Sequence, residues 1–363
     1  MDSDVTTQKW ATIPLPQSTL IKIGTSTIYP FTTNQKFRVP TCTAMAEEIA
    51  KFIIGPMPAQ EFLDDFFPIR RLQNLHVVPS FTPGCYDETL KAKCELNVYI
   101  PFVSAFKKPS NCSNAIPIVS KIEATIQFLP GLCIVNTSSH ADRNPRSSLP
   151  FEIKPDVSIY PGNSTVTKTD SSISEIFTEF KWNTKDNPFC NVVDKNGWKS
   201  FLHDSKAGRD TLGQITSYAA AQLGAQFRTH IYSVFILRDM ARILQWDRSG
   251  TIVTEAIKYN EDCLLAEFFC RYSKAPPAMR GNDMTALPPT PNQAHLARKD
   301  LKLGTEILLV KLSIPWDAGN KNCFFVVPAP SATLYTPPGR ATHGFKAYDT
   351  RYQNVVFLKD SWC

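Results

Sequence analysis

Two short stretches of the chain carry carboxylates and a lysine at a spacing that suits metal-assisted chemistry. In KPDVSIYPG (154–162), Asp156 opens a β-rich run, and in FTEFKWN (177–183), Glu179 and Lys181 lie two residues apart. Residues two apart on a strand point to the same face. If the two runs pair as strands, the carboxylates of Asp156 and Glu179 converge on one divalent cation. Hard oxygen ligands of this kind suit Mg²⁺.

A cation held in this way would serve phosphodiester chemistry. The metal would polarise a phosphoryl oxygen and lower the pKa of a bound water, while Lys181 would orient that water or neutralise the developing charge. The alternative interpretation is two half-exposed strands whose charged side chains face solvent. A Glu-x-Lys spacing alone does not decide between the two, because any exposed strand can supply one.

The elements that must position these residues follow from the pattern of apolar side chains. Between residues 41 and 55 apolar residues recur at helical spacing, and Gly55-Pro56 ends the run. Residues 175–183 alternate as a strand does. The predicted order is helices at 41–55, 57–68 and 95–106, strands at 131–138, 156–160 and 175–183, a helix at 213–226, a strand at 230–237, a hairpin at 240–257 with its turn at 247–250, and a helix at 263–273.

This order resembles the PD-(D/E)XK nuclease superfamily, whose core is helix, three strands, helix, strand. The resemblance rests on Pro155-Asp156, on Glu179-Phe180-Lys181 and on the helix that follows. The expected fold class is α/β with a restriction-endonuclease-like core. The resemblance implies Asp156, Glu179, Lys181 and Gln214 as catalytic residues, with Asp156 and Glu179 as metal ligands, Gln214 in the first turn of the second helix, and Glu47, Glu48 and Glu61 as candidates for a glutamate that the family's first helix often supplies.

A second resemblance comes from GRDTLGQITSYAAAQLGAQFRTHIYSVFILRDMARILQWDRSGTIVTEAIKYN and from FFCRYSKAPPAMRGND, PPGRATHGF and VVFLKDSW. These stretches are similar to the fungal-type protein kinase family, over residues 130–363. The resemblance implies ATP as a ligand. Gly339 and Gly344 would be the glycines of a degenerate glycine-rich loop, with Ala341 in place of its middle glycine. Lys359 would stand where the third-strand lysine of a kinase contacts phosphates.

The catalytic half of a kinase is missing from the sequence. It contains no His-Arg-Asp and no Asp-Phe-Gly, so phosphoryl transfer would lack its base and its Mg²⁺ ligands. The resulting prediction is a family member truncated before the catalytic core, acting as a regulatory or binding module with a nuclease-like fold. Two alternatives stay open: a Mg²⁺-dependent nuclease using Asp156, Glu179 and Lys181, and an ATP-binding protein kinase if the gene continues past residue 363.

Composition sets the size and the kinds of partner. The 363 residues, 43% of them hydrophobic, suffice for two domains or for one large domain with attachments. A net charge of +6 permits a nucleic-acid or protein partner without requiring one. The predicted parts are a weakly ordered arm at 1–40, a PD-(D/E)XK-like α/β domain at 41–274, a proline-rich linker at 275–305 and, at 306–363, a strand-rich extension that resembles the start of a kinase N-lobe.

The sequence also indicates a compartment. No apolar run approaches the ~18 residues of a membrane span, and the first residues lack the basic and apolar regions of a signal peptide. The ten cysteines form no C-x-x-C pair, which argues against zinc. We expect an intracellular protein, cytoplasmic or nuclear, with reduced thiols and no membrane partner.

Overall fold

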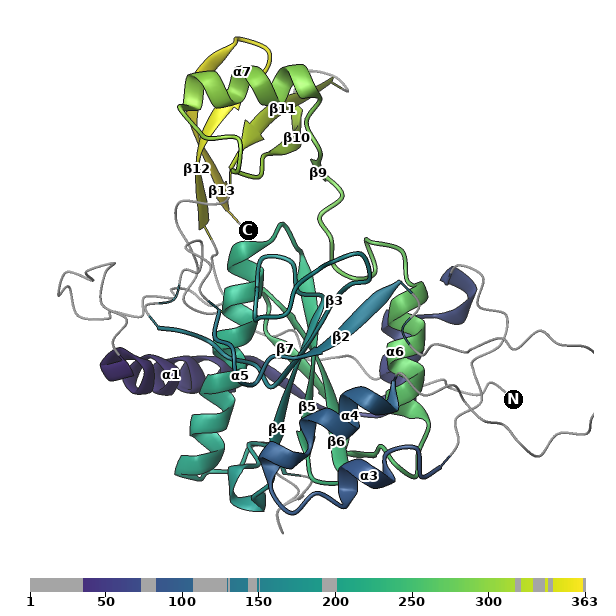
Figure 1. Cartoon of the computed structure of the whole chain (residues 1–363). Helices are drawn as coiled ribbons and strands as arrows, with labels where there is room; N and C mark the ends of the chain where they lie inside the picture. The colour runs from purple at the N-terminus through teal and green to yellow at the C-terminus, as the bar shows by residue number, and fades with distance from the viewer. Residues whose placement is uncertain are drawn as a thin grey trace, which may run out of the picture.

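The computed structural model describes residues 35–72, 83–106, 129, 131–142, 149, 151–190, 201–316, 321–328, 337–338 and 342–361. Within them lie a large α/β body and a smaller sheet that packs against one helix (Figure 1). The arm expected at 1–40 falls mostly outside these residues, but helix α1 (Gln35–Ile49) already includes its end. None of the helices in the described ranges is long and apolar enough to cross a membrane.

A mixed eight-stranded sheet forms the centre of the large body. Its strands are β1 (Ile53–Met57), β2 (Leu132–Asn136), β3 (Val157–Pro161), β4 (Ile176–Lys181), β5 (His230–Leu237), β6 (Met240–Asp247), β7 (Thr251–Thr254) and β8 (Ile257–Lys258). Their order is β1-β7-β6-β5-β4-β3-β2, with β8 paired to β6. The β1/β7 and β4/β5 pairs are parallel and the others antiparallel.

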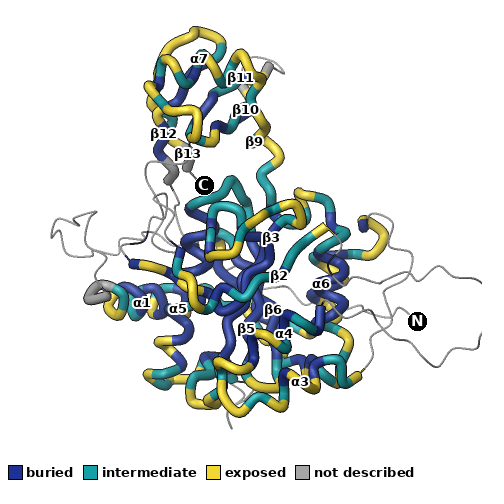
Figure 2. The backbone as a smooth tube through the Cα atoms, viewed as in Figure 1, coloured by how far each residue is buried: buried dark blue, intermediate teal, exposed yellow. Residues whose placement is uncertain are grey.

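Helices cover both faces of this sheet, which gives three layers (Figure 1). On one face lie α1 and α5 (Lys206–Ala225), and on the other lie α2 (Ala59–Phe66), α4 (Tyr99–Ala105) with the short α3 (Asp87–Leu90) beside it, and α6 (Leu264–Lys274). Strand β4 serves both cores, because Ile176 and Phe180 pack on the α4 side and Phe177 on the α5 side. The central strands are accordingly buried along their length (Figure 2).

The first helix lies earlier in the chain than predicted. It spans Gln35–Ile49 where 41–55 was expected, and the chain then enters β1. Ile53 fits the helical spacing but pairs in parallel with Thr251 of β7. A strand partner far along the chain outweighs the local pattern here. The three strands that end at Lys181 are confirmed, as is the strand at 230–237.

Helix α5 also begins earlier than predicted, at Lys206 and not at 213. Ser205 caps it, because the Ser205 Oγ accepts a hydrogen bond from the Gly208 N–H at 3.0 Å. Gln214 therefore lies in the third turn of α5, and its expected place in the first turn is wrong. Gly213 lies where α5 meets α1, and a Cβ there would collide with the Cys42 backbone. The two helices can approach this closely only because the residue is glycine.

The hairpin predicted at 240–257 is confirmed. Strands β6 and β7 pair antiparallel, and the Asp247 carboxylate accepts hydrogen bonds from the N–H groups of Ser249 at 2.7 Å and Gly250 at 3.1 Å. Gly250 has a φ of 143°, which side-chain-bearing residues rarely adopt. Aspartate and glycine together therefore set the tip of the hairpin.

A second sheet, of five strands, lies at one end of the large body (Figure 1). Its strands are β9 (Ala286–Leu287), β10 (Val310–Trp316), β11 (Lys321–Val327), β12 (Thr342–Asp349) and β13 (Asn354–Ser361). They pair antiparallel in the order β13-β12-β11-β10-β9. Helix α7 (Pro291–Leu301) packs on this sheet through Ala297 and Leu301.

The proline-rich segment at 275–305 is not a linker throughout, because it contains α7. The Thr290 hydroxyl accepts from the Gln293 N–H at 3.3 Å, and the Gln293 side chain accepts from the Thr290 N–H at 3.0 Å. This reciprocal capping box fixes the helix start. Pro291 follows at the first helical position, where a missing N–H is harmless. A proline that suggested a linker thus begins a helix.

Contacts at one end of the large sheet join the small sheet to the large body. The rings of Phe227 and Phe345 stack with their centroids 5.8 Å apart, and Arg248 Nη1 donates to the Pro337 carbonyl at 3.3 Å. Phe227 precedes β5 and Arg248 lies in the hairpin turn after β6, so both come from the same end of the large sheet. This end positions the small sheet.

Candidate functional site

The register of β3 and β4 brings the three residues of the predicted site together. Val157 on β3 pairs with Thr178 on β4 in antiparallel orientation, so Asp156, just before β3, lies opposite Glu179. Lys181 follows on the same face of β4, and its Nζ donates to Glu179 Oε1 at 2.5 Å. The predicted convergence of Asp156, Glu179 and Lys181 is therefore confirmed.

The cluster is buried. Glu179 is 1% exposed and Asp156 8%, and the Lys181 side chain is 14% exposed. The Phe180 N–H donates to Asp156 Oδ2 at 2.8 Å, whereas Glu179 Oε2 is buried without a hydrogen-bond partner. The interpretation of two half-exposed strands is wrong. A buried strand that carries these groups is costly for the fold, so the arrangement calls for a functional explanation.

Burial dominates the electrostatics of the cluster. Burial raises the pKa of Asp156 to about 6, against the opposing effects of the Phe180 N–H and Lys181. Burial and then the Asp156 charge hold the pKa of Glu179 well above its ordinary range. Burial alone would lower the pKa of Lys181, but the two carboxylates outweigh it and the pKa is raised. The lysine therefore stays charged, and the carboxylate pair holds a proton up to a higher pH than ordinary carboxylates do.

The carboxylate pair fits a divalent cation. One lysine balances only one of the two carboxylates, so the fully deprotonated cluster carries a net negative charge. Glu179 Oε2 and the Asp156 carboxylate supply oxygen ligands, and Mg²⁺ is often held by one or two carboxylates while it keeps several waters. Among the described residues no group of three or more His, Cys, Asp or Glu side chains could hold a metal ion. Waters would complete the coordination.

Two residues at the α4 layer reach the cluster although the sequence did not indicate them. The Glu95 charge acts on Asp156, Glu179 and Lys181. The Tyr99 hydroxyl hydrogen-bonds to Asp156 and lies 3.4 Å from Glu95 Oε1. Both come from a segment about 60 residues before Asp156, so only the packing of α4 against the sheet brings them there.

The three glutamates that were candidates to complete the metal site differ in burial. Glu47 and Glu61 are exposed, and Glu48 is half-buried on α1. Glu61 belongs to α2, which covers the opposite face of the sheet from α1. Glu95, which the sequence did not single out, is a carboxylate whose charge acts on all three residues of the cluster.

Gln214 is connected to the site by a hydrogen bond to Tyr218. Gln214 Nε2 donates to the Tyr218 hydroxyl at 2.7 Å, and that hydroxyl donates to the Lys154 carbonyl at 3.0 Å. Burial and then the charges of Glu179 and Asp156 raise the pKa of Tyr218 well above its ordinary value, which places the hydroxyl near both carboxylates. Tyr218 thus links Gln214 to the backbone just ahead of Asp156.

The raised carboxyl pKa values predict that stability falls as the pH rises. The folded-state pKa of Asp156 is about 6 against an ordinary 3.8, so the folded state holds this proton more tightly than the unfolded chain. The stabilisation is complete below pH 3.8 and is lost as the pH rises through about 6. At about 1.4 kcal/mol per pH unit, the expected loss is about 3 kcal/mol.

Urea unfolding of the wild type and of Asp156→Asn, in EDTA at about pH 4 and about pH 7, measures this loss. The variant keeps the side-chain shape but cannot titrate. It should therefore gain stability relative to the wild type at the higher pH. A wild-type-minus-variant difference that is the same at both pH values would contradict the raised pKa of Asp156.

Two of the residues expected at an ATP site, Gly344 and Lys359, lie in the small sheet. Gly344 is buried inside β12 and pairs in register with Lys359 on β13, which is exposed. Gly339 and Ala341 lie outside the described residues. Gly344 was expected in a glycine-rich loop, and this is wrong, because eight residues of β12 run through it as regular strand.

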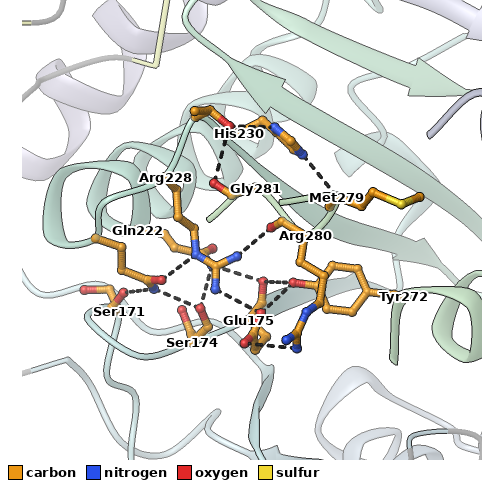
Figure 3. Close-up of polar contacts among 12 residues, drawn as sticks. Ser171, Ser174, Glu175, Gln222, Arg228, His230, Tyr272, Met279, Arg280 and Gly281 are labelled. Carbon is orange, nitrogen blue, oxygen red and sulfur yellow. Dashed lines mark hydrogen bonds and ion pairs between the residues drawn. The ribbon is translucent and has the colours of Figure 1, made fainter. Parts of the chain in front are cut away.

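A second buried charged cluster lies at the other end of β4 (Figure 3). The Glu175 carboxylate accepts from Arg228 Nη2 at 2.9 Å, from the Tyr272 hydroxyl at 2.7 Å and from Arg280 Nη1 at 3.4 Å. Burial alone would raise the pKa of Glu175, but the two arginines lower it below its ordinary value. Unlike the Asp156 cluster, this one pairs its single carboxylate with two arginines, and it joins the segments around β4, β5 and α6.

The residues around Glu175 also hold the segment after α6 against β5 (Figure 3). Arg228 Nη1 donates to the Arg280 carbonyl at 2.7 Å, and His230 Nε2 donates to the Met279 carbonyl at 3.2 Å. Gly281 has a φ of 90°, and a Cβ on it would collide with the His230 carbonyl oxygen. Only glycine allows this close approach of two backbones.

Fold and site together define a three-layer α/β protein with a buried carboxylate–lysine cluster at the end of one central strand. Comparisons with protein-family models, curated proteins and solved structures found no match to this chain. The functional argument therefore depends on the geometry and chemistry of the cluster.

Proposed function

We propose that the chain is a binding or regulatory module with a nuclease-like core that holds a divalent cation, Mg²⁺ by preference, between Asp156 and Glu179. One observation carries the proposal: the Glu179 carboxylate is 1% exposed, and its Oε2 is buried beside Asp156 without a hydrogen-bond partner. An unpaired buried carboxylate oxygen is expensive unless a ligand satisfies it. A cation bound there would replace the proton that the pair retains.

The order of the core elements supports the nuclease-like interpretation. Helix α1, strands β2, β3 and β4, helix α5 and strand β5 follow one another as helix, three strands, helix, strand, with β1 and α2–α4 inserted after α1. Within this order Asp156 precedes the second strand of the three, and Glu179 and Lys181 end the third. These are the positions that the resemblance to PD-(D/E)XK nucleases implies.

Phosphodiester hydrolysis is the second candidate, and the position of Lys181 favours it. Its Nζ lies 2.5 Å from Glu179 Oε1, and its side chain is the most exposed of the three, at 14%. A phosphate that approached the cluster would meet this ammonium group first. When bound, Mg²⁺ would polarise a phosphoryl oxygen and acidify a water. Lys181 would neutralise charge on the phosphate.

Calorimetric titration with Mg²⁺ and with Mn²⁺ tests the cation site. We expect saturable binding to the wild type, and an affinity lower by about tenfold or more in Asp156→Asn and in Glu179→Gln, because each variant removes one charged oxygen ligand. Glu61→Gln, which removes an exposed carboxylate on α2, is the matched control and should bind like the wild type.

Two outcomes of this experiment separate the proposals. Equal cation affinity in the wild type, Asp156→Asn and Glu179→Gln would overturn the cation site. A labelled oligonucleotide incubated with the same preparations and Mn²⁺ decides the second candidate, because cutting by the wild type that is lost in Glu179→Gln assigns hydrolysis to this cluster. If the protein binds the cation but does not cut the oligonucleotide, the module has a binding role and not a hydrolytic one.

The resemblance to the fungal-type protein kinase family supports a regulatory role for the module within a kinase system. We predict that this chain transfers no phosphate from ATP to protein, because it has no His-Arg-Asp base and no Asp-Phe-Gly ligand for Mg²⁺. Incubation with radiolabelled ATP and generic protein substrates checks this, with Lys359→Ala as the comparison. Transfer by the wild type that disappears in Lys359→Ala would refute the prediction.

A further inference from the structure

A cavity of about 230 Å³ lies on the face of the large sheet that packs against α5. Its apolar wall includes Phe189, Phe235 and Leu237, and its polar groups include His203 and Arg242. His203 is exposed, whereas Arg242 is 5% exposed. The cavity therefore extends from the surface at His203 to a buried guanidinium at Arg242.

The cavity lies on the same face of the sheet as Glu179. Glu179 on β4 pairs with Phe235 on β5, and Phe235 pairs with Arg242 on β6. Residues that pair across neighbouring strands share one face of the sheet, so these three form a row. With strands ~4.8 Å apart, the Arg242 Cα lies about 10 Å from the Glu179 Cα. A carboxylate site and a guanidinium thus stand two strands apart on one surface.

Arg242 is held rigidly at the bottom of the cavity. Its Nη1 donates to the Thr254 carbonyl at 2.6 Å, and its guanidinium carbon lies 5.6 Å from the Phe189 ring centroid and 5.3 Å from that of Phe201. Burial lowers the pKa of Arg242 to about 10, and the nearby Cys190 and Glu255 do not restore it. The group is still a cation at neutral pH, in surroundings that strengthen its attraction for an anion.

We infer that this cavity is a phosphate-binding subsite that takes one sugar–phosphate unit, with the phosphate against Arg242 and the sugar along Phe189 and Phe235. A planar guanidinium suits direct contact with phosphate oxygens, in addition to the hydrogen bond that Arg242 Nη1 donates to Thr254. The cavity has the volume of about eight water molecules, at ~30 Å³ each, which is the scale of a sugar ring with one phosphate.

Two sources can supply such a unit: a nucleic-acid strand or a free sugar phosphate. The row from Glu179 to Arg242 favours a strand, because one phosphate would meet the cation and a neighbouring unit of the same strand would enter the cavity. This choice of source rests on the proposed cation site. The affinity of the cavity for a sugar phosphate does not depend on it.

Calorimetry in EDTA tests the subsite without any contribution from a divalent cation. The probes are ribose 5-phosphate, ribose as the uncharged control, and a single-stranded oligodeoxynucleotide followed by fluorescence anisotropy. We expect ribose 5-phosphate to bind and ribose not to bind. Arg242→Gln should weaken the ribose 5-phosphate and oligonucleotide affinities by about tenfold to a hundredfold, the usual value of a charged hydrogen bond.

Two further variants make the test specific. Ala256→Phe fills the cavity from its wall and leaves Arg242 in place. It should therefore abolish binding of ribose 5-phosphate. This variant replaces Arg242→Gln in the test if Arg242→Gln does not fold. Arg209→Gln removes an exposed arginine in the first turn of α5, outside the cavity wall, and should bind as the wild type does.

The outcomes separate the subsite from the proposed function. Ribose 5-phosphate affinity that is unchanged in folded Arg242→Gln and Ala256→Phe overturns the subsite. Loss of ribose 5-phosphate binding with unchanged oligonucleotide binding supports the subsite and overturns the strand as its source. Failure of the cation site in its own titration leaves the EDTA result standing, because no divalent cation takes part in it.

Discussion

Replacing Lys181 with methionine is expected to lower the free energy of unfolding by about 3 kcal/mol at neutral pH in the absence of divalent cations. Lys181 is the cation next to two buried carboxylates, and its Nζ bonds to Glu179 Oε1. Removal of one partner of a buried ion pair costs about 3–5 kcal/mol, because the other charge is left uncompensated. The lower end of the range applies because the pair already retains a proton. Urea unfolding measures the effect.

Two companion variants identify the cause of this loss. Lys181→Arg keeps the charge and should retain most of the stability. Glu179→Gln combined with Lys181→Met removes both members of this ion pair, and should recover part of the loss because one fewer buried carboxylate is left without its cation. If Lys181→Met alone and the double variant are equally unstable, the loss comes from packing of the lysine side chain and not from its charge.

Replacing Gly281 with alanine is expected to cost about 2–6 kcal/mol of unfolding free energy, which combines two separate penalties. A φ of 90° is strained for alanine, at about 1–3 kcal/mol. The new methyl group would also collide with the His230 carbonyl oxygen, and overpacking adds about 1–3 kcal/mol. The collision pushes the segment that carries Arg280 away from β5, so the contact between Arg280 and Glu175 is weakened too.

Gly131→Ala separates strain from collision in this prediction. Gly131 also has a positive φ, 76°, but nothing lies within 4 Å of the position that its Cβ would take. Its replacement should cost only the strain, about 1–3 kcal/mol. Thermal unfolding of both variants checks the difference. Equal losses at Gly131 and Gly281 would show that close packing against His230 contributes nothing.

The central cluster could be predicted from the sequence because its geometry is local. Glu179 and Lys181 share a face by the two-residue period of a strand, and Asp156 joins them through one antiparallel pairing. The hairpin turn was equally local, because its aspartate and glycine set the turn conformation themselves.

The parts that the sequence did not predict depend on contacts between distant segments. Glu95 reaches the cluster only when α4 packs on the sheet, and no periodicity in residues 95–106 signals that destination. Ile53 is a strand residue because of Thr251, nearly two hundred positions later. The two arginines that contact Glu175 come from two other segments, and no spacing in the sequence predicts that they lie together.

The outer position of β13 has a consequence for the colloidal behaviour of the protein. This strand ends the order of the small sheet, and its Phe357 is 74% exposed and Val355 39%. An outer strand with apolar side chains is a template for edge-to-edge pairing between copies. Lys359 on the same strand is exposed and pairs with Gly344, and a lysine on an edge strand opposes such pairing. Lys359 can therefore oppose aggregation whether or not it contacts a phosphate.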